Sequence, residues 1–263
     1  MLNSYSMFNT WVAHPVMMMT FLGASLSAQT VTIRADVTGD RVYDDVVVGE
    51  NYVLLVDKMS CCKRTKRFVV DACDSLVDVM VEDYHRGIYG KEIAVVQSGG
   101  SGIFTDIYAY ANNRIEQVAF TLPGRVMRDA YGMVFCLEQD HADSTHVSVP
   151  HAVSTQGKLL EKMSAISEQD TVIVLEPGGL QRIELPVTRA ACLVLCAASV
   201  NGRVGFSLHD QNGEPLAFEH SDGRLVAIVH AAQAEVVELV MDNMVSAVRE
   251  KVSCITRQYP DNE

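Results

Sequence analysis

The chain contains 263 residues, of which 48% are hydrophobic and 21% are charged, and its formal net charge is −12. Such a composition supports a hydrophobic core and excludes an intrinsically disordered chain. The acidic balance argues against nucleic acid and anionic membrane surfaces as partners, because both are bound through a basic face. The basic cluster at residues 63–67 is expected on an exposed loop or an edge strand.

The first residues have the pattern of a secretory signal peptide. Residues 1–33 contain no Asp, Glu, Lys or Arg, residues 11–26 are mostly apolar, and the small residues at 25–28 are suited to cleavage. We expect a signal peptide over residues 1–28, a secreted or periplasmic protein, and no membrane span after cleavage. The alternative is a buried first strand or a poorly ordered terminus.

Acidic residues recur at alternate positions in the stretch 36–44, directly before a β-branched run at 46–48. Ca²⁺ takes six to eight oxygen ligands at ~2.3–2.6 Å, and a tight loop supplies them from alternate positions. We therefore predict a Ca²⁺ site in this loop. Its ligands are the side chains of Asp36, Thr38, Asp40 and Asp44 and the main-chain carbonyl of Val42. The alternative is that these carboxylates form only a solvated turn.

The same stretch resembles the loop of FG-GAP/VCBS repeats, which reads roughly Asp-x-Asn/Asp-Gly-Asp-Gly-x-x-Asp and leads into a strand. The match includes Asp36, Gly39, Asp40 and Asp44, whereas Thr38 and Arg41 stand where the family has Asn or Asp and Gly. The resemblance covers residues 30 to about 120. It implies an exported, non-catalytic β protein, structural, adhesive or envelope-associated, with a protein or glycan partner.

Short strands separated by turn residues are predicted throughout the N-terminal half. A second loop at 83–92 can be laid on the first with an offset of 47 residues, which places Asp83 on Asp36 and Glu92 on Asp45. The spacing predicts two blade-like β units. Strands are expected at 30–33, 45–48, 52–56, 68–70, 93–96, 105–110 and 115–120, and residues 75–82 fit a strand or a short helix.

A hydrolytic site is the alternative function suggested by these residues. Ser98 and Ser101 flank a glycine-rich stretch, and His141 and His146 lie among acids in a polar segment. The glycine spacing does not match a nucleophile elbow, and a turn between strands is the expected use. A secreted hydrolase, or a hydrolase accessory or inhibitor module, would require these groups to converge in one pocket.

Seven cysteines are present, and an odd number leaves at least one thiol free or paired between chains. Cys61 or Cys62 is expected to form a local bridge with Cys73. Cys192 and Cys196 are expected as buried small hydrophobic residues on one face of a strand.

The C-terminal half is predicted to be a second β domain. A linker over 146–169 includes a short helix at 157–166, since its apolar residues have helical spacing. Seven short strands with X-Gly turns between them predict a β-sandwich over 170–258. Residues 244–256 form a final strand or helix and 259–263 a frayed tail. The order of strands loosely resembles the bacterial pre-peptidase C-terminal sandwich. The predicted fold class is mainly β, with N-terminal blade-like antiparallel units over 29–145 followed by this sandwich.

Overall fold

The computed structural model describes residues 30–50, 52–58, 64–69, 75–85, 87–100, 102–139, 148–155, 159–189, 191–221 and 223–260. This part of the chain consists of strands, turns and loops and contains no helix, which confirms the predicted mainly β class. A membrane-spanning helix is accordingly absent from the described residues. The strands form five antiparallel sheets, named A to E here in chain order.

The first three sheets are four-stranded meanders, in which each strand pairs with the strand that precedes it in the chain. Sheet A contains β1 (Val31–Ala35), β2 (Asp44–Val48), β3 (Tyr52–Asp57) and β4 (Arg64–Val69). Sheet B contains β5 (Ser75–Glu82), β6 (Glu92–Gly99), β7 (Gly102–Ala111) and β8 (Arg114–Pro123). Sheet C contains β9 (Arg125–Arg128), β10 (Val134–Gln139), β11 (Ser148–Ser154) and β12 (Glu161–Lys162).

Sheets D and E face each other around one apolar cluster and form the predicted sandwich. Sheet D has the order β13 (Ser167–Leu175), β20 (Glu250–Pro260), β15 (Ala191–Ser199), β18 (Arg224–His230) and β17 (Glu219–Ser221). Sheet E has the order β14 (Leu180–Pro186), β19 (Val236–Asp242) and β16 (Gly205–Asp210). The cluster between them includes Leu195 of β15 and Leu239 of β19.

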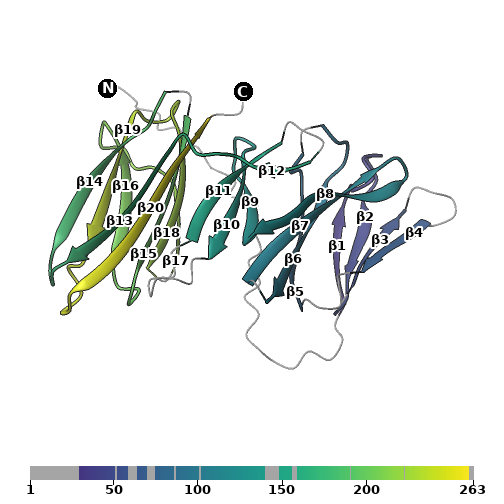
Figure 1. The fold of residues 1–263 in the computed structure, drawn as a ribbon, viewed down its shortest axis with the longest axis horizontal. Coiled ribbons are helices and arrows are strands. Elements are labelled where there is room, and N and C mark those ends of the chain that lie inside the picture. The colour runs from purple at the N-terminus through teal and green to yellow at the C-terminus, as the bar shows by residue number, and fades with distance from the viewer. Residues whose placement is uncertain are drawn as a thin grey trace, which may run out of the picture.

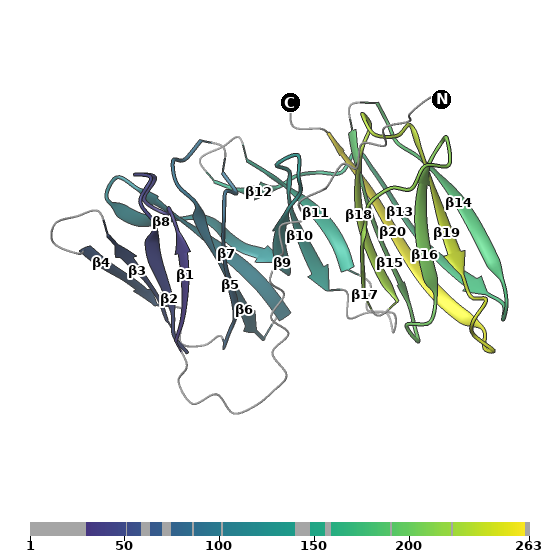
Figure 2. The same cartoon turned by 180° about the vertical axis from the view of Figure 1, so that it is seen from behind.

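The five sheets are stacked face to face in one series, with sheet E at one end and sheet A at the other (Figures 1 and 2). Sheets A and B share one apolar cluster and sheets B and C share another. Sheet C contacts sheet D through two further clusters, one around Phe135 and Tyr259 and one around Cys196 and Ile255. Sheets B, C and D are therefore covered on both faces.

Burial on both faces explains the continuous apolar runs in the sequence. All nine residues of β15 are buried, because its two faces contact sheet C and sheet E. Such a strand reads as an unbroken hydrophobic run instead of an alternating one. The strand β3, in an outer sheet, shows the alternation of intermediate and buried residues expected when one face is covered.

Two sequence predictions for the middle and the end of the chain are wrong. The described residues 159–166 contain β12 and irregular chain instead of a helix, and the predicted linker contains β11 and the start of β13. Main-chain bonds from Leu160 to Val118 and from Met163 to Ala152 hold this segment against sheets B and C. Tyr259 belongs to β20 and is 1% exposed, so it is not in a frayed tail.

Candidate functional site

The predicted Ca²⁺ loop connects β1 to β2 and is closed by its own hydrogen bonds. Asp36 accepts the main-chain N–H of Gly39 at 2.8 Å on one carboxylate oxygen and that of Arg41 at 2.9 Å on the other. Asp40 accepts the N–H of Val42 at 2.8 Å. Gly39 and Arg41 have φ values of 75° and 69°, which wind the chain tightly around the Asp36 carboxylate.

Asp44, the last predicted ligand, points into the protein. It is 0% exposed, and its Oδ2 accepts the N–H groups of Val37 and Thr38 at 3.0 Å and the Thr38 hydroxyl at 3.1 Å. Its Oδ1 accepts the N–H of Lys58 at 3.4 Å. Asp44 thus joins the end of β1, the start of β2 and the end of β3.

The predicted ligands do not form a cation cage in this conformation. Across the described residues, no group of three or more His, Cys, Asp or Glu side chains is arranged to hold a metal ion. Oxygen donors of the type that Ca²⁺ prefers are present, but those of Asp36 and Asp44 are directed at main-chain N–H groups. A bound cation would have to compete with these bonds.

The second loop, between β5 and β6, repeats this arrangement. Glu92 is the first residue of β6, as Asp44 is of β2, and it is also 0% exposed. Its Oε2 accepts the N–H groups of Tyr84 at 2.7 Å and His85 at 3.1 Å, which follow β5 as Val37 and Thr38 follow β1. When the two loops are aligned by these bonds, Glu92 is equivalent to Asp44 and not to Asp45. The two loops therefore share one hydrogen-bonding arrangement, and the second loop is one residue longer.

Glu92 has fewer partners than Asp44. Both of the N–H groups that it accepts reach Oε2, whereas Oε1 is buried and has no partner among the described residues. Burial raises the pKa of Glu92 from 4.5 to about 7, although the N–H groups of Tyr84 and His85 oppose this shift. Burial together with neighbouring carboxylates also raises the pKa of the Tyr84 phenol. In the sequence, Glu92 is marked only by its place in the second loop and directly before the predicted strand 93–96.

The two loops lie against each other. Lys91 donates its main-chain N–H to the carbonyl oxygen of Asp36 at 2.8 Å. A Cβ on Gly39 would lie 2.8 Å from the main chain of Tyr89, and one on Gly90 would lie 2.3 Å from the carbonyl oxygen of Val37. Both glycines are therefore required by close packing. The same loops expose aromatic side chains to solvent: Tyr43 is 70% exposed and Tyr89 is 88% exposed.

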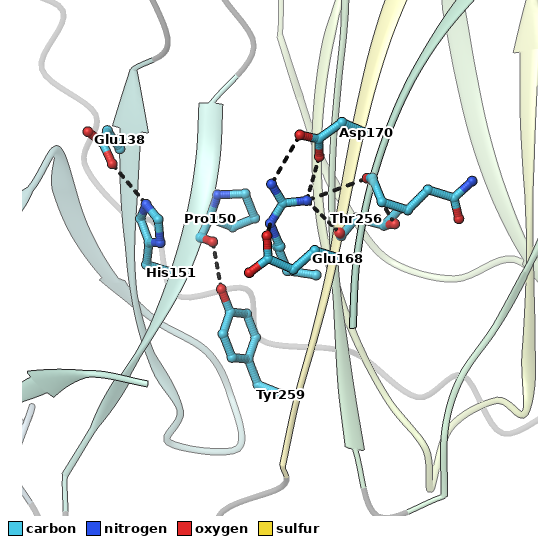
Figure 3. A network of polar contacts seen from close by, with 9 residues as sticks. Glu138, Pro150, His151, Glu168, Asp170, Thr256 and Tyr259 are labelled. Carbon is cyan, nitrogen blue, oxygen red and sulfur yellow. Dashed lines mark hydrogen bonds and ion pairs between the residues drawn. The ribbon is translucent and has the colours of Figure 1, made fainter. Parts of the chain in front are cut away.

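A polar network lies at the junction of sheet C with the sandwich (Figure 3). The Arg257 guanidinium is 9% exposed and pairs with Asp170 at 2.5 Å and with Glu168 at 3.4 Å. Nearby, His151 and Glu138 are 2.9 Å apart, and burial lowers the pKa of His151. These side chains come from β10, β11, β13 and β20. The Arg257 pairs lie within sheet D and the His151–Glu138 pair lies within sheet C, and sequence reasoning missed both because each pair joins two different strands.

A buried His–Asp pair joins sheet C to sheet D. His230 Nε2 lies 2.7 Å from Asp129 Oδ2, and the two side chains are 6% and 8% exposed. The other Asp129 oxygen accepts the N–H groups of Tyr131 and Met133, and the Tyr131 ring lies 4.3 Å from the His230 ring. Asp129 thus fixes the turn between β9 and β10 against the sandwich.

The residues of the alternative hydrolytic site are not brought together by the described structure. Ser98 lies near the end of β6, next to the tight turn into β7, and Ser101, His141 and His146 lie outside the described residues. Cys136, Cys192, Cys196 and Cys254 are buried, as predicted for Cys192 and Cys196. Burial raises the pKa of Cys136, Cys196 and Cys254 to about 12, so these thiols are unreactive. Cys61, Cys62 and Cys73 lie outside the described residues.

No protein-family model and no curated protein matches this chain. Among solved structures, an exo-β-1,3-galactanase from Phanerochaete chrysosporium is similar with a TM-score of 0.30 and 8% identity, over 87% of this chain and 68% of that one. A β-fructofuranosidase from Bombyx mori is similar with a TM-score of 0.24 and 9% identity, over 84% and 63%. Likenesses this weak establish neither fold nor function.

Proposed function

We propose that this chain is an exported, non-catalytic β protein that binds a protein or glycan partner at the cell envelope or outside the cell. In this proposal the loops 36–44 and 83–92 are the binding surface, and residues 1–28 are a signal peptide. The buried or bonded acids Asp36, Asp44 and Glu92 hold the two loops in shape, while Tyr43 and Tyr89 contact the partner. The net charge of −12 argues against nucleic acid as that partner.

The observation that carries the proposal is the exposure of two tyrosines on loops that are otherwise fixed. Tyr43 and Tyr89 are 70% and 88% exposed. Tyr43 precedes Asp44, whose carboxylate accepts two main-chain N–H groups, and Tyr89 precedes Gly90, which packs closely against the main chain of Val37. Tyr side chains combine a large apolar surface with a hydroxyl group and are enriched in binding interfaces. Loops that are ordered before binding lose less conformational entropy when they bind.

Binding of the mature chain, from Gln29, to an envelope fraction tests the proposal. The double variant Tyr43→Ser/Tyr89→Ser should bind at least ~10-fold more weakly, as expected for loss of interface aromatic residues. Phe120→Ser is the control, since Phe120 is 57% exposed but lies on β8, outside the two loops. Protease treatment of the fraction separates a protein partner from a glycan. Equal binding by the double variant and the wild type would refute the proposal.

Ca²⁺ binding by Asp36, Thr38, Asp40, Val42 and Asp44 remains a separate prediction, tested by thermal unfolding with Ca²⁺ and with a chelator. A Ca²⁺ concentration of about 100 times Kd stabilises the folded state by about 2.7 kcal/mol. Each kcal/mol raises Tm by roughly 2–4 °C in a domain of this size. A shift that Asp40→Ala abolishes would establish the site. No shift at about 10 mM Ca²⁺, above the usual Kd of extracellular sites, would exclude it.

The alternative function, a secreted hydrolase or a hydrolase accessory or inhibitor module, has no support among the described side chains. Ser98 has no histidine partner there. The variants His141→Ala and His146→Ala would test it against any hydrolytic activity of the mature chain.

A further inference from the structure

We propose that Glu92, Tyr84 and His85 form a proton-controlled latch, which is closed while Glu92 is protonated and loosens when Glu92 is ionised. The comparison with Asp44 leads to this inference. The two residues begin equivalent strands and accept equivalent pairs of main-chain N–H groups. Only Asp44 receives further donors, the Thr38 hydroxyl and the N–H of Lys58. Of these two residues, only Glu92 has a buried oxygen without a partner in the described part of the chain.

An unpaired buried oxygen makes the ionised form of Glu92 unfavourable in the closed loop. A buried charge is tolerated only when its hydrogen-bonding capacity is satisfied. A proton on Oε1 removes the charge and leaves Oε2 free to accept the N–H groups of Tyr84 and His85. The raised pKa of Glu92, about 7, agrees with this geometry.

The charged groups around Glu92 also favour its protonated form. Glu82 lies directly opposite in the pairing of β5 with β6, and Asp83 follows it. The nearest cations are paired with these exposed acids, Lys91 with Glu82 at 3.8 Å and Arg128 with Asp83 at 3.7 Å. Asp78 of β5 adds negative charge beside Tyr84. Within the described structure, Glu92 has no ion-pair partner of its own.

The direction of the pH effect follows from linkage. Opening the loop exposes Glu92 to water and returns its pKa towards 4.5, whereas the closed loop holds it at about 7. The closed loop therefore binds the proton more tightly, and its advantage is complete below pH 4.5 and declines as the pH rises through 7. A difference of about 2.5 pH units corresponds to a factor of about 300 in the equilibrium between closed and open loop.

Loosening of this loop would reach its neighbour. The bond from Lys91 to the Asp36 carbonyl and the contact of Gly39 with Tyr89 tie it to the loop 36–44. The latch would therefore control how Tyr43 and Tyr89 are presented. This consequence rests on the proposed function, whereas the latch itself does not.

Amide hydrogen exchange of the mature chain, without any partner, tests the latch. Protection of the Tyr84 and His85 amides, corrected for intrinsic exchange rates, should fall by up to ~10-fold per pH unit between pH 4.5 and about pH 7 and should level off above that. In Glu92→Gln it should not change with pH. The control Asp44→Asn should weaken protection at Val37 and Thr38 and leave the pH dependence at Tyr84 and His85 intact. Equal corrected protection at about pH 6 and pH 8.5 in the wild type would overturn the proposal.

Two further measurements keep the test independent of variant folding and of His85. The Glu92 carboxyl group can be titrated by NMR in the wild type, where a midpoint near 4.5 would overturn the proposal and one near 7 would support it. In His85→Asn, whose amide oxygen can still accept the Gly87 N–H as His85 Nδ1 does at 3.0 Å, the pH dependence at Tyr84 should persist. Its loss would assign the effect to His85 instead.

Discussion

The phenolic oxygen of Tyr259 lies 2.7 Å from the main-chain carbonyl oxygen of Pro150. Tyr259 is in the last strand of sheet D and Pro150 is in sheet C, so this buried bond connects the sandwich to the sheets that precede it. The Tyr259 ring also packs edge-on against Phe135 of β10, with ring centroids 6.4 Å apart. The end of the chain therefore contributes to the junction between two sheets.

Tyr259→Phe should lower the free energy of unfolding by about 1–2 kcal/mol, because the ring packing is kept and only the buried hydrogen bond is lost. Urea denaturation measures this difference. Tyr89→Phe is the control. Because Tyr89 is 88% exposed, this variant should have the same free energy of unfolding as the wild type. If Tyr259→Phe unfolds at the same urea concentration as the wild type, the Tyr259 hydroxyl contributes nothing to stability.

Asp44→Ala should destabilise the protein by about 2–4 kcal/mol, because it leaves the buried N–H of Val37 and the N–H of Thr38 without their acceptor. Asp40→Ala should have an effect of about 0.5–1 kcal/mol, because Asp40 makes one exposed turn bond to Val42. Chemical denaturation of both variants compares two acids of the same loop. Equal effects would contradict the view that Asp44 anchors the loop from within.

Asp129→Ala should destabilise the protein by about 2–4 kcal/mol, since it removes the partner of buried His230 and the acceptor of two turn N–H groups. The matched control is Glu138→Ala, which breaks the other His–carboxylate pair of sheet C. Glu138 is 49% exposed, so its loss should change stability by less than about 1 kcal/mol. Thermal unfolding compares the stability of the two variants, and a larger loss of stability in Glu138→Ala than in Asp129→Ala would refute this account.

Gly124→Ala should destabilise the protein by more than about 3 kcal/mol or prevent folding. Gly124 has a φ of 72°, and a Cβ there would lie 1.7 Å from the carbonyl oxygen of Leu137 in the adjacent strand. Gly213→Ala is the control, with a φ of 82° but open space around the added atom, and about 1 kcal/mol is expected. The yield of soluble protein and its Tm measure the effects of both substitutions.

Much of the strand pattern was predictable because strands and turns leave local signals. The turn at Asn112 and Asn113 adopts φ values of 52° and 62°, as its sequence suggests, and the seven strands predicted for the sandwich are all present. The third meander was not recognised, because the polar stretch between β10 and β11 suggested a boundary between domains. Helical spacing in residues 157–166 was misleading because long-range bonds to Val118 and Ala152 decide the conformation there.

The candidate site was predictable only in part. The acids of the loop 36–44 are visible in the sequence, but the direction in which Asp44 points depends on β1 and β3, which no local pattern encodes. Glu92 was aligned with Asp45 because the sequence does not reveal that the second loop is one residue longer. Tyr259 was assigned to a tail because its burial is provided by sheet C, more than a hundred residues earlier in the chain.

The serial stacking of the sheets has a thermodynamic consequence. In such an array, stability approximates a sum of layer terms and nearest-neighbour interface terms, as in repeat proteins. The described part of sheet A shares an apolar cluster with one neighbour, sheet B, and sheet E shares one with sheet D alone, whereas sheets B, C and D each share clusters with two neighbours. Detachment of either end sheet therefore breaks one interface instead of two, and unfolding should begin at sheet A or sheet E. Sheets B, C and D, covered on both faces, should be the last part of the array to exchange their amide hydrogens.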